Sequence, residues 1–180
     1  MILYHGTTLS AVKSIRKGID VRINKDRELD FGSGFYLSDS KYALKTAKEK
    51  AKQSRDAGYD DLPVLVEIKL DIVAILIGDY KVLQLSRKNK QFLDTVFKCR
   101  YYQGKDILKA DFVIAPLADG NIDSIMSFYR KKENKIRKLI CFLHFLVPVF
   151  HRQYVVKSEE IVKLIKIISI KDEKGGIIDE

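Results

Sequence analysis

This chain of 180 residues has no tryptophan, three prolines and two cysteines. Cys99 and Cys141 are too few for a disulfide framework, and they give no metal-ligand spacing. The cysteine count therefore argues against a secreted disulfide scaffold and against a metal centre. We expect a protein without a metal, in a reducing cytoplasm.

Long apolar runs are also missing. A membrane-spanning helix needs about 20 apolar residues, whereas Leu139 to Phe150 offers only about a dozen and contains His144 and Pro148. We expect this run to be buried in the protein. The start, Met1 to His5, has no basic region before an apolar one, so we expect no signal peptide and no membrane partner.

The composition supports one folded unit. With 46% hydrophobic residues, a chain of this length can bury one sizeable core but not two. We expect a single domain over residues 1–171 and a frayed tail over residues 172–180. The net charge of +9 attracts polyanions without selecting one. The basic run from Arg130 to Lys138 lacks interleaved aromatic residues, so we interpret it as a solvated helix face rather than a nucleic-acid surface.

Short helices scattered among strands, without strict alternation, predict an α+β domain rather than a doubly wound sheet. Hydrophobic patterns predict strands at 2–8, 64–70, 72–77, 81–85, 111–115, 153–156 and 165–170. Helical patterns lie at 10–17, 40–57, 89–101, 122–129, 133–145 and 158–166.

The stretch from Asp30 to Ser38, DFGSGFYLS, is the strongest local signal. Gly32 and Gly34 allow a sharp turn or a close approach to a ligand, and a strand follows. Phe35 and Tyr36 should point to opposite faces, so one ring can pack inward while the other faces a planar ligand. The loop before this stretch, residues 19–29, carries Arg22, Lys25 and Arg27, which could supply the counter-charge for a pyrophosphate.

The first strand contains a second motif, Tyr4-His5-Gly6-Thr7. A lone histidine at a strand is more often structural than functional, but this motif is followed by FGSGFY, by Ile114 to Gly120 and by Gln153 to Glu159. The series resembles the ADP-ribosyltransferase superfamily, in the branch of the poly(ADP-ribose) polymerases, and most of all a poorly characterised bacterial family. The resemblance covers nearly the whole chain. It implies two packed, mainly antiparallel sheets with peripheral helices around an NAD cleft.

The resemblance also implies roles for individual residues, with NAD as the substrate. His5 would bind the nicotinamide-side ribose hydroxyl, the Gly6 backbone would meet the carboxamide, and Tyr36 would stack on the nicotinamide. With Gln153 on the late strand, His5 and Tyr36 form the expected catalytic set. The expected cofactor-binding set is His5, Gly6, Thr7, Asp30, Gly32, Gly34, Phe35, Tyr36 and Ser38.

Two positions depart from the better-known enzymes. Gln153 stands where poly(ADP-ribose) polymerases carry a glutamate, and losing one preorganised electrostatic group can cost ~3 to 4 kcal/mol of transition-state stabilisation. Thr46 stands where the bacterial family has a tryptophan. Glu159 and Glu160 could replace the missing carboxylate, although we interpret them as helix-start residues.

These departures leave three functions open. The first is an NAD-dependent mono-ADP-ribosyltransferase, toxin-like, with an unknown protein or nucleic-acid acceptor and a small antitoxin-like partner encoded beside it. The second is a noncatalytic NAD-binding or interaction module, and the third is a transferase like the tRNA 2′-phosphotransferases, which would need several phosphate-binding arginines. We expect His5, Tyr36 and Gln153 to converge in one cleft. We also expect Tyr36→Phe to preserve NAD binding and Gln153→Glu to raise NAD turnover.

Overall fold

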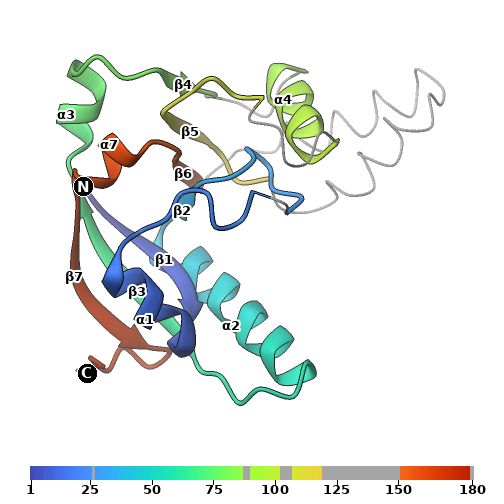
Figure 1. The fold of residues 1–180 in the computed structure, drawn as a ribbon, viewed down its shortest axis with the longest axis vertical. Helices are drawn as coiled ribbons and strands as arrows, with labels where there is room; N and C mark the ends of the chain where they lie inside the picture. Colours follow the sequence, from blue (N-terminus) through green and yellow to red (C-terminus); the bar gives the residue numbers. More distant parts are fainter. Residues whose placement is uncertain (26, 87–89, 102–106, 119–150, 179–180) are drawn as a thin grey trace.

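The computed structural model describes residues 1–25, 27–86, 90–101, 107–118 and 151–178 (Figure 1). The helices expected at 122–129 and 133–145, the basic segment 130–138 and the apolar run 139–150 lie outside the described residues. The domain is α+β, as the sequence predicts.

Sheet A consists of three antiparallel strands in the order β1 (Ile2–Thr8), β3 (Pro63–Leu70) and β7 (Ile165–Asp172). The pairing of β1 with β3 sets His5 opposite Val66 and Gly6 opposite Leu65. Because side chains alternate along a strand, His5 and Thr7 share the face of Leu3, whereas Gly6 lies on the opposite face.

Sheet B has four shorter strands in the order β2 (Phe35–Leu37), β6 (Arg152–Val156), β5 (Phe112–Pro116) and β4 (Val82–Gln84). All neighbours are antiparallel except β4 and β5, which are parallel. The expectation of two mainly antiparallel sheets is therefore confirmed.

The main core lies between the two sheets. It combines Leu3, Val64, Val66, Ile68, Leu70 and Ile170 of sheet A with Phe35, Leu37, Phe112, Ile114 and Val156 of sheet B. The sheets are also joined by one isolated antiparallel bridge between Tyr4 of β1 and Ser38 just after β2. Beyond this bridge the two strands belong to different sheets, and the candidate site lies at their divergence.

Within the described residues the sheets are accompanied by helices α1 (Leu9–Lys17), α2 (Ser40–Asp56), α4 (Lys90–Tyr101) and two short ones, α3 (Ile72–Ile77) and α7 (Glu159–Val162). Helix α4 contributes Phe92, Leu93 and Val96 to a second core on the other face of sheet B. Helix α2 begins at its cap, Asp39, whose carboxylate accepts the Tyr42 N–H.

Helix α2 packs closely on β1 through small residues. Its buried residues are Ala43, Ala47 and Ala51, spaced by four so that they form one stripe. A Cβ added at Gly6 would lie 1.8 Å from the Ala43 carbonyl oxygen. The glycine is therefore required by the helix contact, which brings the cavity-facing side of α2 next to β1.

Two expectations about local structure are wrong. Residues 72–77 form helix α3 (Ile72–Ile77) rather than a strand, because the Asp71 carboxylate caps the Ala74 N–H and starts a helical turn. The helix expected at 158–166 ends at Val162, and β7 takes over from Ile165.

The tail also differs from the expectation of fraying at Asp172. The chain turns at Asp172–Gly176, and the Ile178 N–H donates to the Ile170 carbonyl, which returns the tail to β7. Fraying is therefore not observed over the residues up to Ile178.

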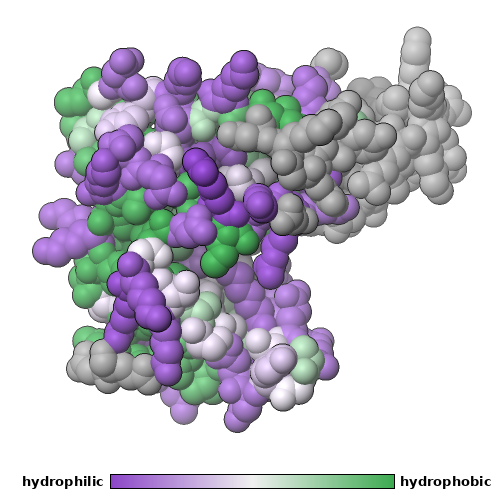
Figure 2. All heavy atoms as spheres, viewed as in Figure 1, coloured by the Kyte–Doolittle hydropathy of each residue, from purple (hydrophilic) through white to green (hydrophobic). Residues whose placement is uncertain are grey.

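Hydrophilic side chains cover most of the face shown in Figure 2, and apolar atoms show at the corner occupied by α3. Val73, Leu76 and Ile77 of α3 are exposed there. None of the helices within the described ranges has the length and apolar character needed to cross a bilayer.

Candidate functional site

Two adjoining cavities open where β1 and β2 diverge. The smaller cavity has a volume of about 240 Å³ and lies among β1, β2, α2, β6 and the loop from Asn24 to Gly34. The larger cavity, about 520 Å³, lies between this loop, α1 and the C-terminal half of α2. They share five lining residues, His5, Asn24, Arg27, Gly34 and Lys50.

Most of the residues expected from the sequence border these cavities. The smaller cavity is lined by His5, Gly6, Asp30, Gly34, Tyr36, Ser38 and Gln153, and the larger one by His5, Thr7, Gly34 and Phe35. Gly32 lines neither cavity. The expected catalytic set of His5, Tyr36 and Gln153 therefore meets in one cavity, although these residues are separated widely along the chain.

His5 connects the two sheets. Its Nδ1 lies 2.8 Å from the Tyr36 carbonyl oxygen, and its ring stacks on Phe35 with centroids 4.3 Å apart. Burial, reinforced by the charge of Lys50, lowers the pKa of His5 to about 3. The ring is therefore neutral near pH 7. Because a carbonyl can only accept, Nδ1 carries the proton and Nε2 presents a lone pair that can accept from a ligand hydroxyl.

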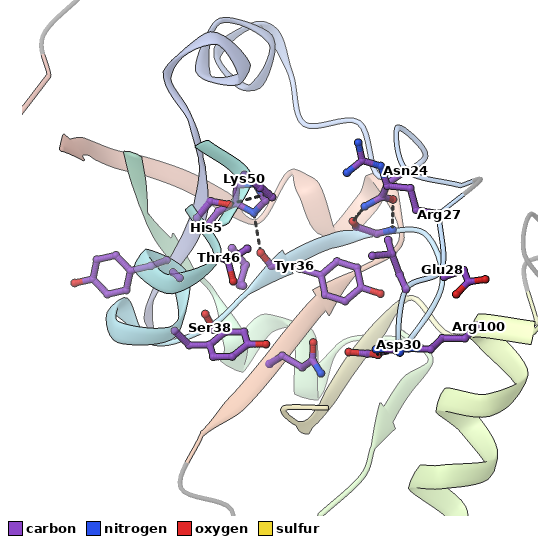
Figure 3. Close-up of a pocket in the computed structure, with 18 residues that line it drawn as sticks. His5, Asn24, Arg27, Glu28, Asp30, Tyr36, Ser38, Thr46, Lys50 and Arg100 are labelled. Carbon is purple, nitrogen blue, oxygen red and sulfur yellow. Dashed lines mark hydrogen bonds and ion pairs between the residues drawn. The ribbon is translucent and has the colours of Figure 1, made fainter. Parts of the chain in front are cut away.

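Phe35 and Tyr36 point to different surroundings, as the alternation of side chains along a strand predicts. Phe35 is buried in the core between the sheets, and Tyr36 faces the smaller cavity (Figure 3). The Tyr36 hydroxyl donates to the Gly32 carbonyl at 2.7 Å and accepts the Phe31 N–H at 3.2 Å. Burial, and then the neighbouring Asp30 carboxylate, raise the pKa of Tyr36, so the hydroxyl stays protonated. The hydroxyl thus holds the glycine loop, Asp30 to Gly34, in place.

Three further side chains hold the glycine loop. The Asn24 amide accepts the Gly34 N–H and donates to the Gly34 carbonyl, both at 3.1 Å. Lys157 donates to the Phe31 carbonyl at 3.0 Å and to the Ser33 carbonyl at 2.6 Å. Arg100 of α4 binds Asp30 through Nε at 2.8 Å and Nη2 at 2.6 Å. Asp30 is therefore held by Arg100 beside the cavity.

Gln153 is buried, with 5% of its surface exposed. Its Nε2 donates to the Pro116 carbonyl on the neighbouring strand at 3.2 Å. This contact fixes the amide orientation, because two carbonyl oxygens cannot bond each other. Within the described residues the Gln153 Oε1 accepts no hydrogen bond, so it remains available to a donor in the cavity.

Gly6 carries a contact that the sequence does not reveal. Lys50 of α2 donates to the Gly6 carbonyl at 2.8 Å. Burial, followed by the charge of Arg27, lowers the pKa of Lys50 to about 8. A carbonyl has a second lone pair, so a ligand amide can still approach Gly6 beside Lys50.

The position of the absent tryptophan lies on the cavity wall. Thr46 lines the smaller cavity together with Tyr42 and Ala43 from the same face of α2. Tyr42 therefore offers an aromatic ring where Thr46 cannot. Glu159 and Glu160 line neither cavity and begin α7 behind its cap, Ser158, which agrees with their interpretation as helix-start residues.

Sequence reasoning located the motif residues but missed the residues that hold them. Asn24, Lys50 and Arg100 lie in no motif, and Lys157 lies in the Gln153 to Glu159 motif without having been given a role; each reaches the site from a different segment. Of the three loop cations expected to supply a counter-charge, Arg27 lines the cavities, whereas Arg22 and Lys25 line neither. Within the described ranges no group of three or more His, Cys, Asp or Glu side chains could hold a metal ion.

Comparison with known proteins gives a family without an assigned activity. No curated protein and no solved structure matches the chain. The model of one family, described as "Protein of unknown function (DUF3990)", matches residues 1–167. The chain therefore belongs to the DUF3990 family.

Proposed function

We propose that this protein is an NAD-dependent mono-ADP-ribosyltransferase with an ADP-ribosyltransferase-like fold. The observation that carries the proposal is the meeting of His5, Tyr36 and Gln153 in one cavity at the divergence of two sheets. These three residues come from β1, β2 and β6, and the motif resemblance assigns all three to NAD.

The geometry suits the release of nicotinamide. Breaking the glycosidic bond builds positive charge on the ribose while the pyridinium leaves. A neutral His5 Nε2 and the Gln153 Oε1 can both accept from ribose hydroxyls. Tyr36 supplies a ring face for nicotinamide, and Tyr42 supplies a second aromatic wall.

The same geometry argues for transfer of single ADP-ribose units. Gln153 brings no negative charge to the ribose cation, so the site lacks one electrostatic contribution worth ~3 to 4 kcal/mol. A slower transferase that uses the acceptor as its base fits this site better than a polymerase. The acceptor is a protein or nucleic acid, and the proposal includes a toxin-like role with a small inhibitory partner.

The test is to incubate the purified protein with NAD, with and without lysate, and to follow nicotinamide and labelled ADP-ribose. We expect nicotinamide release that is lost in His5→Ala and retained in Lys52→Met, a substitution of an exposed lysine that lines neither cavity. Label on a macromolecule supports transfer, and label found only as free ADP-ribose supports hydrolysis.

A noncatalytic NAD-binding module is the second candidate, and the neutral Gln153 favours it. It becomes the better account if NAD binds while nicotinamide release is undetectable in the parent protein. An RNA 2′-phosphotransferase finds less support. Of the two arginines that line the smaller cavity, Arg100 is already engaged with Asp30.

A further inference from the structure

The boundary between the two cavities is positively charged. Lys50 and Arg27 line both cavities, Lys50 from α2 and Arg27 from the loop before the glycine stretch (Figure 3). Their charges are close enough for Arg27 to lower the pKa of Lys50. In the part of the chain that the structure describes, neither side chain forms an ion pair with a carboxylate. Two cations that have no carboxylate partner among the described residues, at a partly buried boundary, favour an anion between them.

Hydrogen bonds hold the loop side of the boundary. The Asn24 side chain holds both backbone polar groups of Gly34, and the Asn24 carbonyl accepts the Arg27 N–H at 3.1 Å. Asn24 thus fixes the backbone of Arg27 relative to the loop that delivers Tyr36. Lys50 is fixed on the other side by its hydrogen bond to Gly6.

The cavities differ in size and lining. The smaller one, about 240 Å³, falls below the range of roughly 300 to 1,000 Å³ typical of ligand pockets, whereas the larger one of about 520 Å³ lies within it. The larger cavity mixes apolar Ile15, Ile19 and Ile23 with the hydroxyls of Thr7 and Thr8 and the ring of Tyr59. This lining suits a nucleoside, which has an apolar base and a hydroxylated sugar.

We propose that Lys50 and Arg27 bind the diphosphate of a dinucleotide that lies across both cavities, with its adenosine half in the larger one. The inference rests on the proposed function for the nicotinamide half in the smaller cavity, beside Tyr36 and Gln153. It makes Lys50, which no motif marks, a determinant of affinity for phosphorylated ligands.

Other charged groups face the same space. Asp20 lines the larger cavity, and Glu28 and Asp30 line the smaller one, where Arg100 binds Asp30. His5 faces both cavities but is neutral at the pH values of the test. Lys50 is therefore the cavity group whose charge changes near pH 8.

The test measures the affinity of ADP-ribose by calorimetry, because its diester phosphates do not titrate near pH 8. We expect Lys50→Met and Arg27→Gln each to weaken binding by about tenfold or more at about pH 7, as expected for losing a charged hydrogen bond. Lys50→Arg should keep most of the affinity. Lys52→Met removes a charge from the same helix outside the cavities and should change the affinity by less than about twofold.

The pH dependence gives a second readout. The positive charge of Lys50 is lost as pH rises through about 8, so wild-type affinity should fall between about pH 7 and about pH 9. Lys50→Arg should not show this fall, because arginine stays charged. Unchanged affinity in a folded Lys50→Met protein, or the same pH profile in wild type and Lys50→Arg, would overturn the inference.

The placement of the two halves is tested with half-ligands. Tyr59→Ala should weaken binding of AMP and leave nicotinamide mononucleotide unaffected, and Tyr36→Ala should do the reverse. The opposite pattern would overturn the assignment of the halves. If ADP-ribose binding depends on Lys50 but nicotinamide is never released, the diphosphate site stands and the catalytic proposal fails. If nicotinamide is released and the affinity for ADP-ribose is the same in wild type and Lys50→Met, only the diphosphate site fails.

Discussion

The two sheets differ in how their geometry is maintained. Sheet A has strands of seven or eight residues, paired along their lengths, whereas sheet B has strands of three to five. The glycine loop beside β2 has few ladder bonds and is held instead by Tyr36, Asn24, Lys157 and Arg100. The backbone therefore maintains the scaffold, and individual side chains maintain the site.

His5 bridges the two sheets, so its substitution should have the largest effect. Burial lowers its pKa from 6.5 to about 3, so only the unfolded chain takes up this proton as the pH drops below 6.5. The wild-type free energy of unfolding should therefore fall by up to about 4 kcal/mol between these values because of His5 alone.

The measurement is urea denaturation at several pH values. His5→Asn should lack this part of the pH dependence, and His151→Asn, which removes the exposed partner of Asp39, should retain the part that comes from His5. The same slope in wild type and His5→Asn would show that the surroundings of His5 do not lower its pKa.

Gly6→Ala tests the close packing of sheet A. Its Cβ would meet backbone atoms of α2 that cannot move independently of the helix. We expect a loss of about 3 kcal/mol in the free energy of unfolding. Gly58→Ala, at a positive φ of 86° but with nothing within 4 Å, should cost only about 1 kcal/mol. Equal costs would mean that α2 does not press on β1.

Gln153→Glu tests the site face of sheet B, and the contact of Gln153 with Pro116 leads us to predict the opposite of what the sequence suggested. A carboxylate at this position would face the Pro116 carbonyl, to which the Gln153 amide now donates. We expect no rise in NAD turnover and a loss of about 2 kcal/mol in stability at pH 7. Gln84→Glu, an exposed change on β4, should be nearly neutral.

The stability loss caused by Gln153→Glu should depend on pH. Burial beside a carbonyl should raise the pKa of the introduced carboxyl, and its protonated form can donate to Pro116. The stability deficit relative to wild type should therefore shrink as pH falls toward about 4.3, the pKa of glutamate in the unfolded chain. A gain in NAD turnover without a loss of stability would contradict this prediction and support the one drawn from the sequence.

Tyr36→Phe should have the smallest effect of the four. Losing the hydroxyl leaves the Gly32 carbonyl and the Phe31 N–H without this partner, at a cost of about 1 kcal/mol. We now expect NAD binding to weaken severalfold as well, because the glycine loop loosens. Tyr154→Phe is the matched control, since within the described residues its hydroxyl makes no hydrogen bond. If calorimetry shows full NAD affinity in Tyr36→Phe, the hydroxyl contributes little to NAD binding.

The fold was predictable where local pattern decides it. The alternation from Val64 to Leu70 in β3 and the four-residue spacing of alanines in α2 each identify an element and its buried face. Residues 72–77 were misassigned because a run rich in isoleucine and valine favours a strand. The structure has a helix there, and its first turn is capped by the Asp71 carboxylate.

The site was predictable only in part, for a physical reason. His5, Tyr36 and Gln153 stand in motifs whose residue types match a chemical task. Lys157 reaches the glycine loop only because β6 pairs with β2, and Lys50 reaches Gly6 only because α2 lies on β1. Contacts of this kind depend on the assembled fold and leave no pattern along the chain.

The bridge between Tyr4 and Ser38 gives the cleft a direct reporter of its opening. Each residue donates its amide to the carbonyl of the other, at 2.9 and 3.0 Å, and these two bonds form the bridge between β1 and the β2 end. Any motion that parts the sheets at this point breaks both bonds together. The two amides should therefore show a common protection factor against exchange with solvent deuterium, and a ligand that holds the cleft closed should slow the exchange of both by the same factor.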